Sequence, residues 1–158
     1  MAYDFNADEV FEMAEQIERN GMKFYQKAAE TIEDDSHKEL LQRLAGMEKH
    51  HEKVFADMRS ELSGMEKQEA TFDPDQDAAE YLRALADTRV FFKKSMDFKS
   101  MKEILTSAIA AEKDSIVFYL GMKGMVPAKW GADKLDLIIK EEMSHITILA
   151  RELAALKK

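Results

Sequence analysis

Glu48-Lys49-His50-His51 is the stretch that decides the fold, because its Glu-x-x-His spacing returns at Glu142-Met143-Ser144-His145. A further glutamate precedes each segment. Glu18 lies 30 residues before Glu48, and Glu112 lies 30 residues before Glu142. The matched separations indicate two helical hairpins that present the same set of carboxylates and imidazoles, as in the two halves of a dinuclear metal site.

Composition favours helices along the whole chain, which is rich in Ala, Leu, Met, Glu and Lys and has only two prolines and six glycines. Capping boxes, in which a short polar residue is followed three residues later by Glu, predict helix starts at Asn6, Ser36 and Ser100. We expect helices over about 6–33, 36–61 and 100–123, and a fourth from about 131 nearly to the C-terminus.

The 158 residues suit one domain that spans 1–158. We expect an all-α, antiparallel four-helix bundle with hairpins over about 6–62 and 100–156. The crossover over about 63–99 contains an expected turn at Asp73-Pro74-Asp75 and a candidate short helix over 76–86, and Phe91, Phe92 and Phe98 are expected to anchor it. Its length lets the second and third helices run parallel, and it equally permits exchange of hairpins between subunits.

A glutamate interrupts the apolar seam of every expected helix near its middle. From Glu18 to the turn near Asp34 is roughly 24 Å of helix, and the return to Glu48 is roughly 21 Å. The second hairpin repeats this arrangement, so all four carboxylates meet at one level of the bundle. Buried ionised carboxylates without partners cost about several kcal/mol each, which makes a bound cation the simplest compensation.

Each Glu-x-x-His pair lies on one helical face, so both side chains can bind one metal ion. Carboxylate oxygens and imidazole nitrogens suit iron, manganese or zinc, and two divalent cations cancel the charge of four carboxylates. We assign Glu18 and Glu112 as terminal ligands and Glu48 and Glu142 as bridges. His51 and His145 supply one nitrogen to each metal, and the two ions would lie roughly 3.5–4 Å apart.

These segments, together with Phe24-Tyr25 and Phe118-Tyr119, resemble the rubrerythrin branch of the ferritin-like di-iron carboxylate proteins. The resemblance covers the four core helices and implies a di-iron bundle that reacts with hydrogen peroxide or dioxygen, in a homodimer. Two departures stand out. The 158 residues contain no cysteine, so they cannot form the thiolate iron site of the rubredoxin domain that typical members carry. Ser115 stands where such members place a second glutamate used in a redox-linked ligand switch, and its counterpart in the first hairpin is Gly21.

Tyr25 and Tyr119 each follow a terminal glutamate by seven residues. They are candidate catalytic residues, as hydrogen-bond donors to ligands or redox relays, with a core aromatic role as the alternative. Other candidates have simpler interpretations. We expect His50 and Glu141 at the surface, His37 exposed in a helix cap, and Glu15 outside the regular ligand set.

A formal net charge of −8 argues against nucleic acid and anionic membranes as partners. Neither a signal peptide nor an apolar run of about 20 residues is present, so we expect a cytoplasmic protein. The leading hypothesis is an oxidoreductase that reduces hydrogen peroxide in oxidative-stress defence, with electrons from an external donor such as a rubredoxin. The alternatives are a bacterioferritin-like ferroxidase and storage protein, a manganese catalase-like enzyme, and a metal-free helical interaction module.

Overall fold

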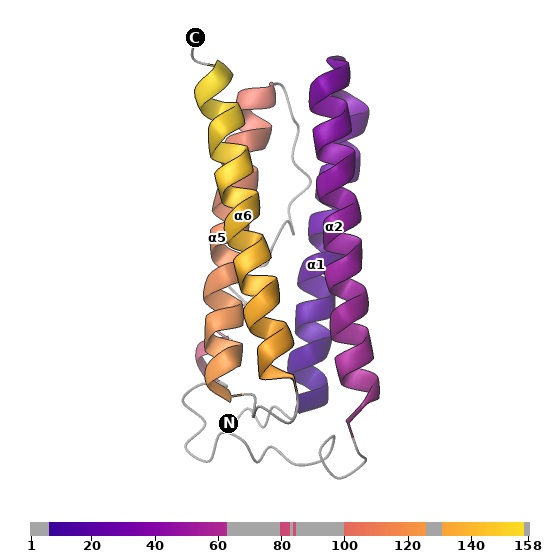
Figure 1. Cartoon of the computed structure of the whole chain (residues 1–158), viewed down its shortest axis with the longest axis vertical. Coiled ribbons are helices and arrows are strands. Elements are labelled where there is room, and N and C mark those ends of the chain that lie inside the picture. The colour runs from indigo at the N-terminus through magenta and orange to yellow at the C-terminus, as the bar shows by residue number, and fades with distance from the viewer. Residues whose placement is uncertain (1–6, 63–79, 83, 85–99, 126–130, 157–158) are drawn as a thin grey trace.

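The computed structural model describes residues 7–62, 80–82, 84, 100–125 and 131–156, and all elements within them are helical. Four long helices form the bundle in Figure 1: α1 (Ala7–Thr31), α2 (Asp35–Ser60), α5 (Met101–Met125) and α6 (Ala132–Leu156). The expected all-α four-helix bundle is confirmed. None of the described helices combines the length and apolarity that crossing a membrane requires.

The helices pair as two antiparallel hairpins, α1 with α2 and α5 with α6. Figure 1 shows α1 and α6 running in one direction and α2 and α5 in the other. Since α2 ends at Ser60 and α5 begins at Met101 at the opposite end of the bundle, these two helices run parallel. The predicted long crossover between the second and third core helices is therefore confirmed.

The helix starts follow local capping chemistry, with one correction. The Ser100 hydroxyl accepts a hydrogen bond from the Glu103 amide at 3.2 Å, as its capping box predicts. The predicted cap at Ser36 is wrong. Asp34 is the N-cap of α2, because its extended backbone places its carboxylate 2.9 Å from the His37 amide that donates to it. The expected cap at Asn6 lies outside the described residues.

The crossover is described only at residues 80–82 and 84, which are helical. Leu82 is fully buried in the core. Tyr81 and Leu82 lie over Gly121 of α5, where an added Cβ would stand 2.8 Å from Tyr81 Cε1. The close approach explains a glycine inside that helix. The predicted turn at Asp73-Pro74-Asp75 and the anchors Phe91, Phe92 and Phe98 lie outside the described residues.

The hydrophobic core is divided into two clusters, and each contains side chains from all four helices. One cluster lies toward the start of α1 and contains Phe11, Phe55, Met122 and Leu135. The other lies toward the start of α2 and contains Phe24, Leu41, Leu105 and Leu149. The residues between these two clusters along every helix are the glutamates and histidines of the apolar seams. The fold therefore presents a polar layer between two apolar ones.

Candidate metal centre

Six predicted ligand side chains meet in this polar layer, and none is more than 2% exposed. Each helix contributes at least one of them, at the position where its apolar seam is interrupted. The six are Glu18 of α1, Glu48 and His51 of α2, Glu112 of α5, and Glu142 and His145 of α6.

The ligand atoms form two sets of four, and within each set they all lie within 4.8 Å of one another. One set contains Glu18 and His51, the other contains Glu112 and His145, and both contain Glu48 and Glu142. His51 Nδ1 lies 3.6 Å from Glu48 Oε2 and 2.6 Å from Glu142 Oε1. His145 Nδ1 lies 3.9 Å from Glu48 Oε1 and 3.4 Å from Glu142 Oε2. Each shared carboxylate therefore directs one oxygen toward each half of the layer.

The two unshared glutamates each belong to one half. Glu18 Oε2 lies 3.5 Å from His51 Nδ1, and Glu112 Oε1 lies 3.4 Å from His145 Nδ1. The imidazole rings stack across the layer, with centroids 5.8 Å apart and planes inclined by 18°. Each half thus holds one imidazole nitrogen, one carboxylate of its own and one oxygen from each shared carboxylate.

Two tyrosines hold the unshared glutamates from across the bundle. The Tyr25 hydroxyl of α1 donates to Glu112 Oε1 at 2.6 Å, and the Tyr119 hydroxyl of α5 donates to Glu18 Oε1 at 2.6 Å. Each hairpin therefore orients a carboxylate of the other. Burial and the adjacent carboxylates raise the pKa of both tyrosines well above the ordinary value, which keeps both hydroxyls protonated as donors.

Burial and mutual repulsion oppose ionisation of the shared carboxylates. Burial raises the pKa of Glu48 and of Glu142 well above the ordinary value, and the neighbouring Glu112 carboxylate raises both further. Burial alone would also raise the pKa of Glu112, but the neighbouring Glu142 carboxyl and His145 imidazole lower it to about 2. The layer without metal therefore keeps protons on some of its carboxylates.

The histidines retain protons in the same environment. Burial alone would lower the pKa of His51, but the carboxylates of Glu142 and Glu18 outweigh it and raise the pKa to about 11. The Glu112 and Glu142 carboxylates likewise raise the pKa of His145 to about 10 against the effect of burial. Bound divalent cations can take the place of these protons, since a ligating imidazole must be neutral at the ligating nitrogen.

Several buried polar atoms of the layer have no hydrogen-bond partner within the described part of the chain. They are Glu48 Oε1, Glu112 Oε2, both ring nitrogens of His145, and Glu142 Oε1 and His51 Nδ1, which lie 2.6 Å apart without the geometry of a hydrogen bond. Buried polar atoms are normally satisfied, and unsatisfied ones carry a free-energy cost of roughly 1–3 kcal/mol each. Unsatisfied oxygens and nitrogens that converge from four helices fit a pair of divalent metal ions. The residues present therefore match the group that the fold implies.

One contact of the cluster was missed by the sequence interpretation. Glu141 is half-buried, with 37% of its side chain exposed, and its Oε2 lies 2.5 Å from His51 Nε2. Glu141 lies partly at the surface, as expected, but the sequence did not predict its contact with His51, which arises because α6 turns this side chain toward α2. The sequence feature that could have indicated this contact is the second acidic residue next to Glu142, because the equivalent position in the first hairpin is Met47.

The other candidates lie apart from the cluster. Glu15 accepts a hydrogen bond from the Arg59 guanidinium at 3.0 Å and takes no part in either ligand set, as expected. His50 is exposed. The expectation that His37 is exposed is wrong, because its side chain is only 22% exposed and lies near Asp34 and Glu152. The buried Ser115 donates its hydroxyl to the Ala111 carbonyl of its own helix at 3.0 Å, so it adds no oxygen to the layer.

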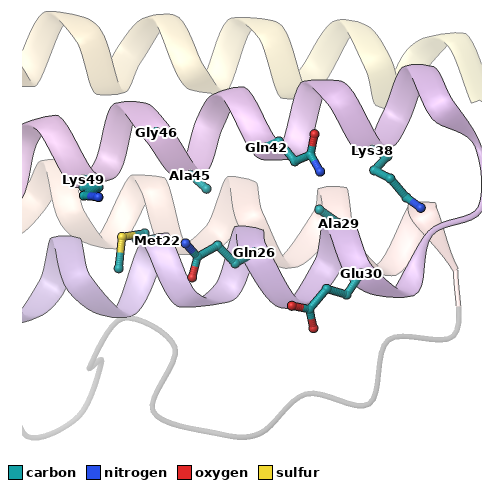
Figure 2. Close-up of a pocket in the computed structure, with 9 residues that line it drawn as sticks. All are labelled: Met22, Gln26, Ala29, Glu30, Lys38, Gln42, Ala45, Gly46 and Lys49. Atoms are coloured by element: carbon teal, nitrogen blue, oxygen red, sulfur yellow. The ribbon is translucent and has the colours of Figure 1, made fainter.

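Two hollows lie near the hairpins. A cleft of about 230 Å³ between α2 and α6 reaches the outer side of the cluster, where His50, His51, Leu137 and Glu141 are among its lining residues. A larger groove of about 650 Å³ runs along α1 and α2, and Figure 2 shows that its lining side chains come from these two helices. The groove contacts none of the six clustered ligands.

Comparison with known proteins agrees with this geometry. The model of the rubrerythrin family matches residues 3–92, which is more than half of the 158 residues and includes Glu18, Glu48 and His51. A crystal structure from Thermotoga maritima, provisionally described as a ferritin-like diiron-carboxylate protein, matches with a TM-score of 0.69 and 24% identity over 95% of each chain. At this identity the match shows a shared fold. No curated protein matches the chain.

Proposed function

This chain belongs to the rubrerythrin family, and from that premise we propose that it is a metal-binding oxidoreductase with a di-iron centre that reduces hydrogen peroxide. One observation carries the proposal. Six buried ligands from four helices form two sets of four that share Glu48 and Glu142, and their unsatisfied atoms face one another. A family relationship without this geometry would support only the fold.

The ligand roles follow from the distances. We propose Glu18 and His51 as the ligands particular to one metal, and Glu112 and His145 as those particular to the other. Glu48 and Glu142 would bridge, since each directs one oxygen toward either half. Oxygen and nitrogen ligands of this kind suit iron, with manganese or zinc as chemically allowed alternatives.

Reduction of hydrogen peroxide to two waters consumes two protons and two electrons. When bound, a pair of ferrous ions would supply the two electrons. The protein's own residues keep the pair in place: Tyr25 and Tyr119 donate to Glu112 and Glu18, and the apolar clusters on either side exclude bulk water. An external donor such as a rubredoxin would restore the electrons, because these 158 residues contain no cysteine for a thiolate iron site.

Small residues lie beside the proposed metals, and we propose that they leave room for substrate. Ser115 and Gly21 lie one helical turn after Glu112 and Glu18, and both are buried. We propose that peroxide occupies this face. Ser115→Leu should retain both metals while slowing oxidation by peroxide at least tenfold, measured by stopped-flow absorbance. An unchanged rate at full metal content contradicts this placement of the substrate.

The proposed activity is tested by anaerobic loading with ferrous iron, followed by peroxide or dioxygen in separate stopped-flow experiments. We expect two irons per chain, rapid oxidation by peroxide and slow oxidation by dioxygen. Glu48→Gln should lose metal stoichiometry. Glu52→Gln should not, because Glu52 pairs with Arg19 outside the layer. Faster oxidation by dioxygen than by peroxide contradicts peroxidase activity.

One alternative has an observation in its favour. The absence of cysteine fits a manganese catalase-like reaction, because disproportionation of peroxide needs no electron donor. Oxygen evolution from peroxide by the manganese-loaded protein, with no turnover by the iron-loaded protein and a donor, would support it. Solution mass separates both enzymes from a bacterioferritin-like storage cage. We propose a homodimer, and a hollow assembly of many subunits contradicts it.

A further inference from the structure

The two hairpins differ at the residue immediately before the shared glutamate. Equivalent positions lie 94 residues apart, as with Glu48 and Glu142 or His51 and His145. By this register Glu141 of the second hairpin corresponds to Met47 of the first. The six inner ligands are therefore duplicated, whereas the residue outside them is a carboxylate in one half and a thioether in the other.

The Glu141 carboxylate contacts Nε2 of His51, the ring nitrogen that faces away from the layer. Its Oε2 lies 2.5 Å from His51 Nε2, while His51 Nδ1 faces the layer, 2.6 Å from Glu142 Oε1. A carboxylate oxygen only accepts in such a contact, so the ring carries its proton on Nε2 and donates it to Glu141. When a metal ion displaces the proton of Nδ1, the proton that stays on Nε2 is held by Glu141 and the lone pair of Nδ1 faces the ion, as in carboxylate–histidine–metal arrangements.

His145 has no equivalent support. Its ring is fully buried, and Nε2 has no hydrogen-bond partner within the described helices. When Nδ1 binds a metal ion, the proton must stand on a buried Nε2 that donates to nothing in those helices. An unsatisfied buried donor costs roughly 1–3 kcal/mol, and this cost falls on one half of the centre only.

The setting of Glu141 also differs from that of the inner carboxylates. It lines the cleft between α2 and α6, and 37% of its side chain is exposed. Solvent therefore reaches this carboxylate, and its charge does not carry the desolvation cost that the fully buried inner glutamates carry. The half that contains His51 gains an oriented ligand and a nearby negative charge at little cost.

We propose that Glu141 is a positioning residue that makes the two halves unequal, so that the half of Glu18 and His51 binds a divalent cation more tightly and fills first. The half of Glu112 and His145 fills second. This proposal rests on the proposed dinuclear site. It adds the order in which the two halves bind metal, which the duplicated ligands alone do not predict.

The test is an anaerobic titration of the metal-free protein with Co²⁺, followed by visible absorption and calorimetry. The wild-type protein should bind two ions in two separate steps. Glu141→Leu should weaken the tighter step about 10- to 100-fold and leave the weaker step unchanged. Glu141→Gln should restore most of the loss, because its amide oxygen still accepts from His51 Nε2. A merely structural residue would show no such rescue.

Combining Glu141→Leu with a second substitution shows which half of the metal centre Glu141 affects. In Glu112→Ala, which leaves the terminal ligand of the His51 half intact, Glu141→Leu should still weaken binding. In Glu18→Ala it should have no further effect. Glu52→Gln is the matched control. Glu52 is the next residue after His51 in the sequence, but its carboxylate pairs with Arg19 and not with His51. Circular dichroism establishes that each variant is folded.

The outcomes separate the two proposals. A folded wild-type protein that binds no divalent cation contradicts the proposed function itself. If the wild-type protein binds two ions but Glu141→Leu leaves the first step unchanged, or weakens both steps equally, only the role of Glu141 is overturned.

Discussion

The four buried glutamates differ in what stabilises them. Glu18 and Glu112 each accept a hydrogen bond from a tyrosine of the other hairpin, whereas Glu48 and Glu142 each direct one oxygen toward either half of the layer. The pair held by tyrosines suits terminal metal ligation in the proposed centre, and the shared pair suits bridging. Chemically identical side chains thus take different roles because their neighbours differ.

Removing one of these donors should destabilise the protein. Tyr119→Phe leaves the buried Glu18 Oε1 without its donor, and we expect a loss of about 1–3 kcal/mol in the free energy of unfolding of the metal-free protein. Tyr25→Phe should have a similar effect through Glu112. Urea denaturation measures both, and Tyr81→Phe is the control because Tyr81 is 44% exposed. Equal stabilities of Tyr119→Phe and the wild type would show that the hydrogen bond contributes nothing.

The histidines predict how stability depends on pH. The folded-state pKa values of His51 and His145, about 11 and about 10, lie above the ordinary value of 6.5. The folded metal-free protein therefore binds these protons more tightly than the unfolded chain does. This stabilisation is complete below pH 6.5 and is lost as pH rises through 10 and 11.

We therefore expect the Tm of the metal-free protein to fall steadily from about pH 7 to about pH 10. Metal loading should flatten this dependence, because the cation replaces the protons, and it should release protons on binding. Thermal unfolding across that range measures the first effect, and titration in weak buffer measures the second. Parallel pH profiles with and without metal would show that these histidines are not the groups involved.

At the level of elements, the helix ends show the local control of the fold. The α6 helix starts after Gly131, whose φ of 104° favours glycine and whose carbonyl accepts from the Leu135 amide at 3.1 Å. A Cβ there would also stand 2.7 Å from Met58 Cε. This one position both allows the chain to enter α6 and packs against the end of α2.

Gly131→Ala should destabilise the protein by about 1–2 kcal/mol, since alanine pays for the left-handed backbone and Met58 must move. Gly46→Ala is the matched control. Gly46 lies inside α2 with nothing within 4 Å of an added Cβ, so alanine should stabilise the protein by roughly 0.5–1 kcal/mol. Chemical denaturation compares the two. Stabilisation by both substitutions would refute the backbone argument at Gly131.

On the scale of the whole molecule, two apolar clusters lie on either side of a layer of four carboxylates and two imidazoles. The apolar clusters hold the helices together, while the polar layer opposes folding until its charges and unsatisfied atoms find partners. Metal binding should therefore stabilise the entire bundle. The same layer that performs the proposed chemistry is then the least stable part of the metal-free fold.

We expect loading with two divalent cations to raise the Tm by roughly 10 °C or more, because ligand at 1,000 times its Kd adds about 4 kcal/mol per site. A chelator should reverse the change. Glu48→Gln should abolish the shift while leaving the metal-free protein folded, since the glutamine amide is neutral like the protonated carboxyl that burial favours at this position. Differential scanning calorimetry measures both proteins, and an unchanged Tm on loading would contradict metal binding in this layer.

The sequence alone was sufficient to determine the helical hairpins, their approximate ends and the convergence of six ligands at one level. These features depend on local periodicity and on the constant rise of a helix, both of which can be read from the spacing of residues along the chain.

The tertiary structure alone decided which neighbours each ligand meets. Tyr25 reaches Glu112, and Glu141 reaches His51, across gaps of 87 and 90 residues. Asp34 replaced Ser36 as a cap because backbone angles, which composition does not encode, set that contact. Such pairings depend on how separate helices pack and rotate against one another, so only the folded molecule shows that a duplicated pattern has two unequal halves.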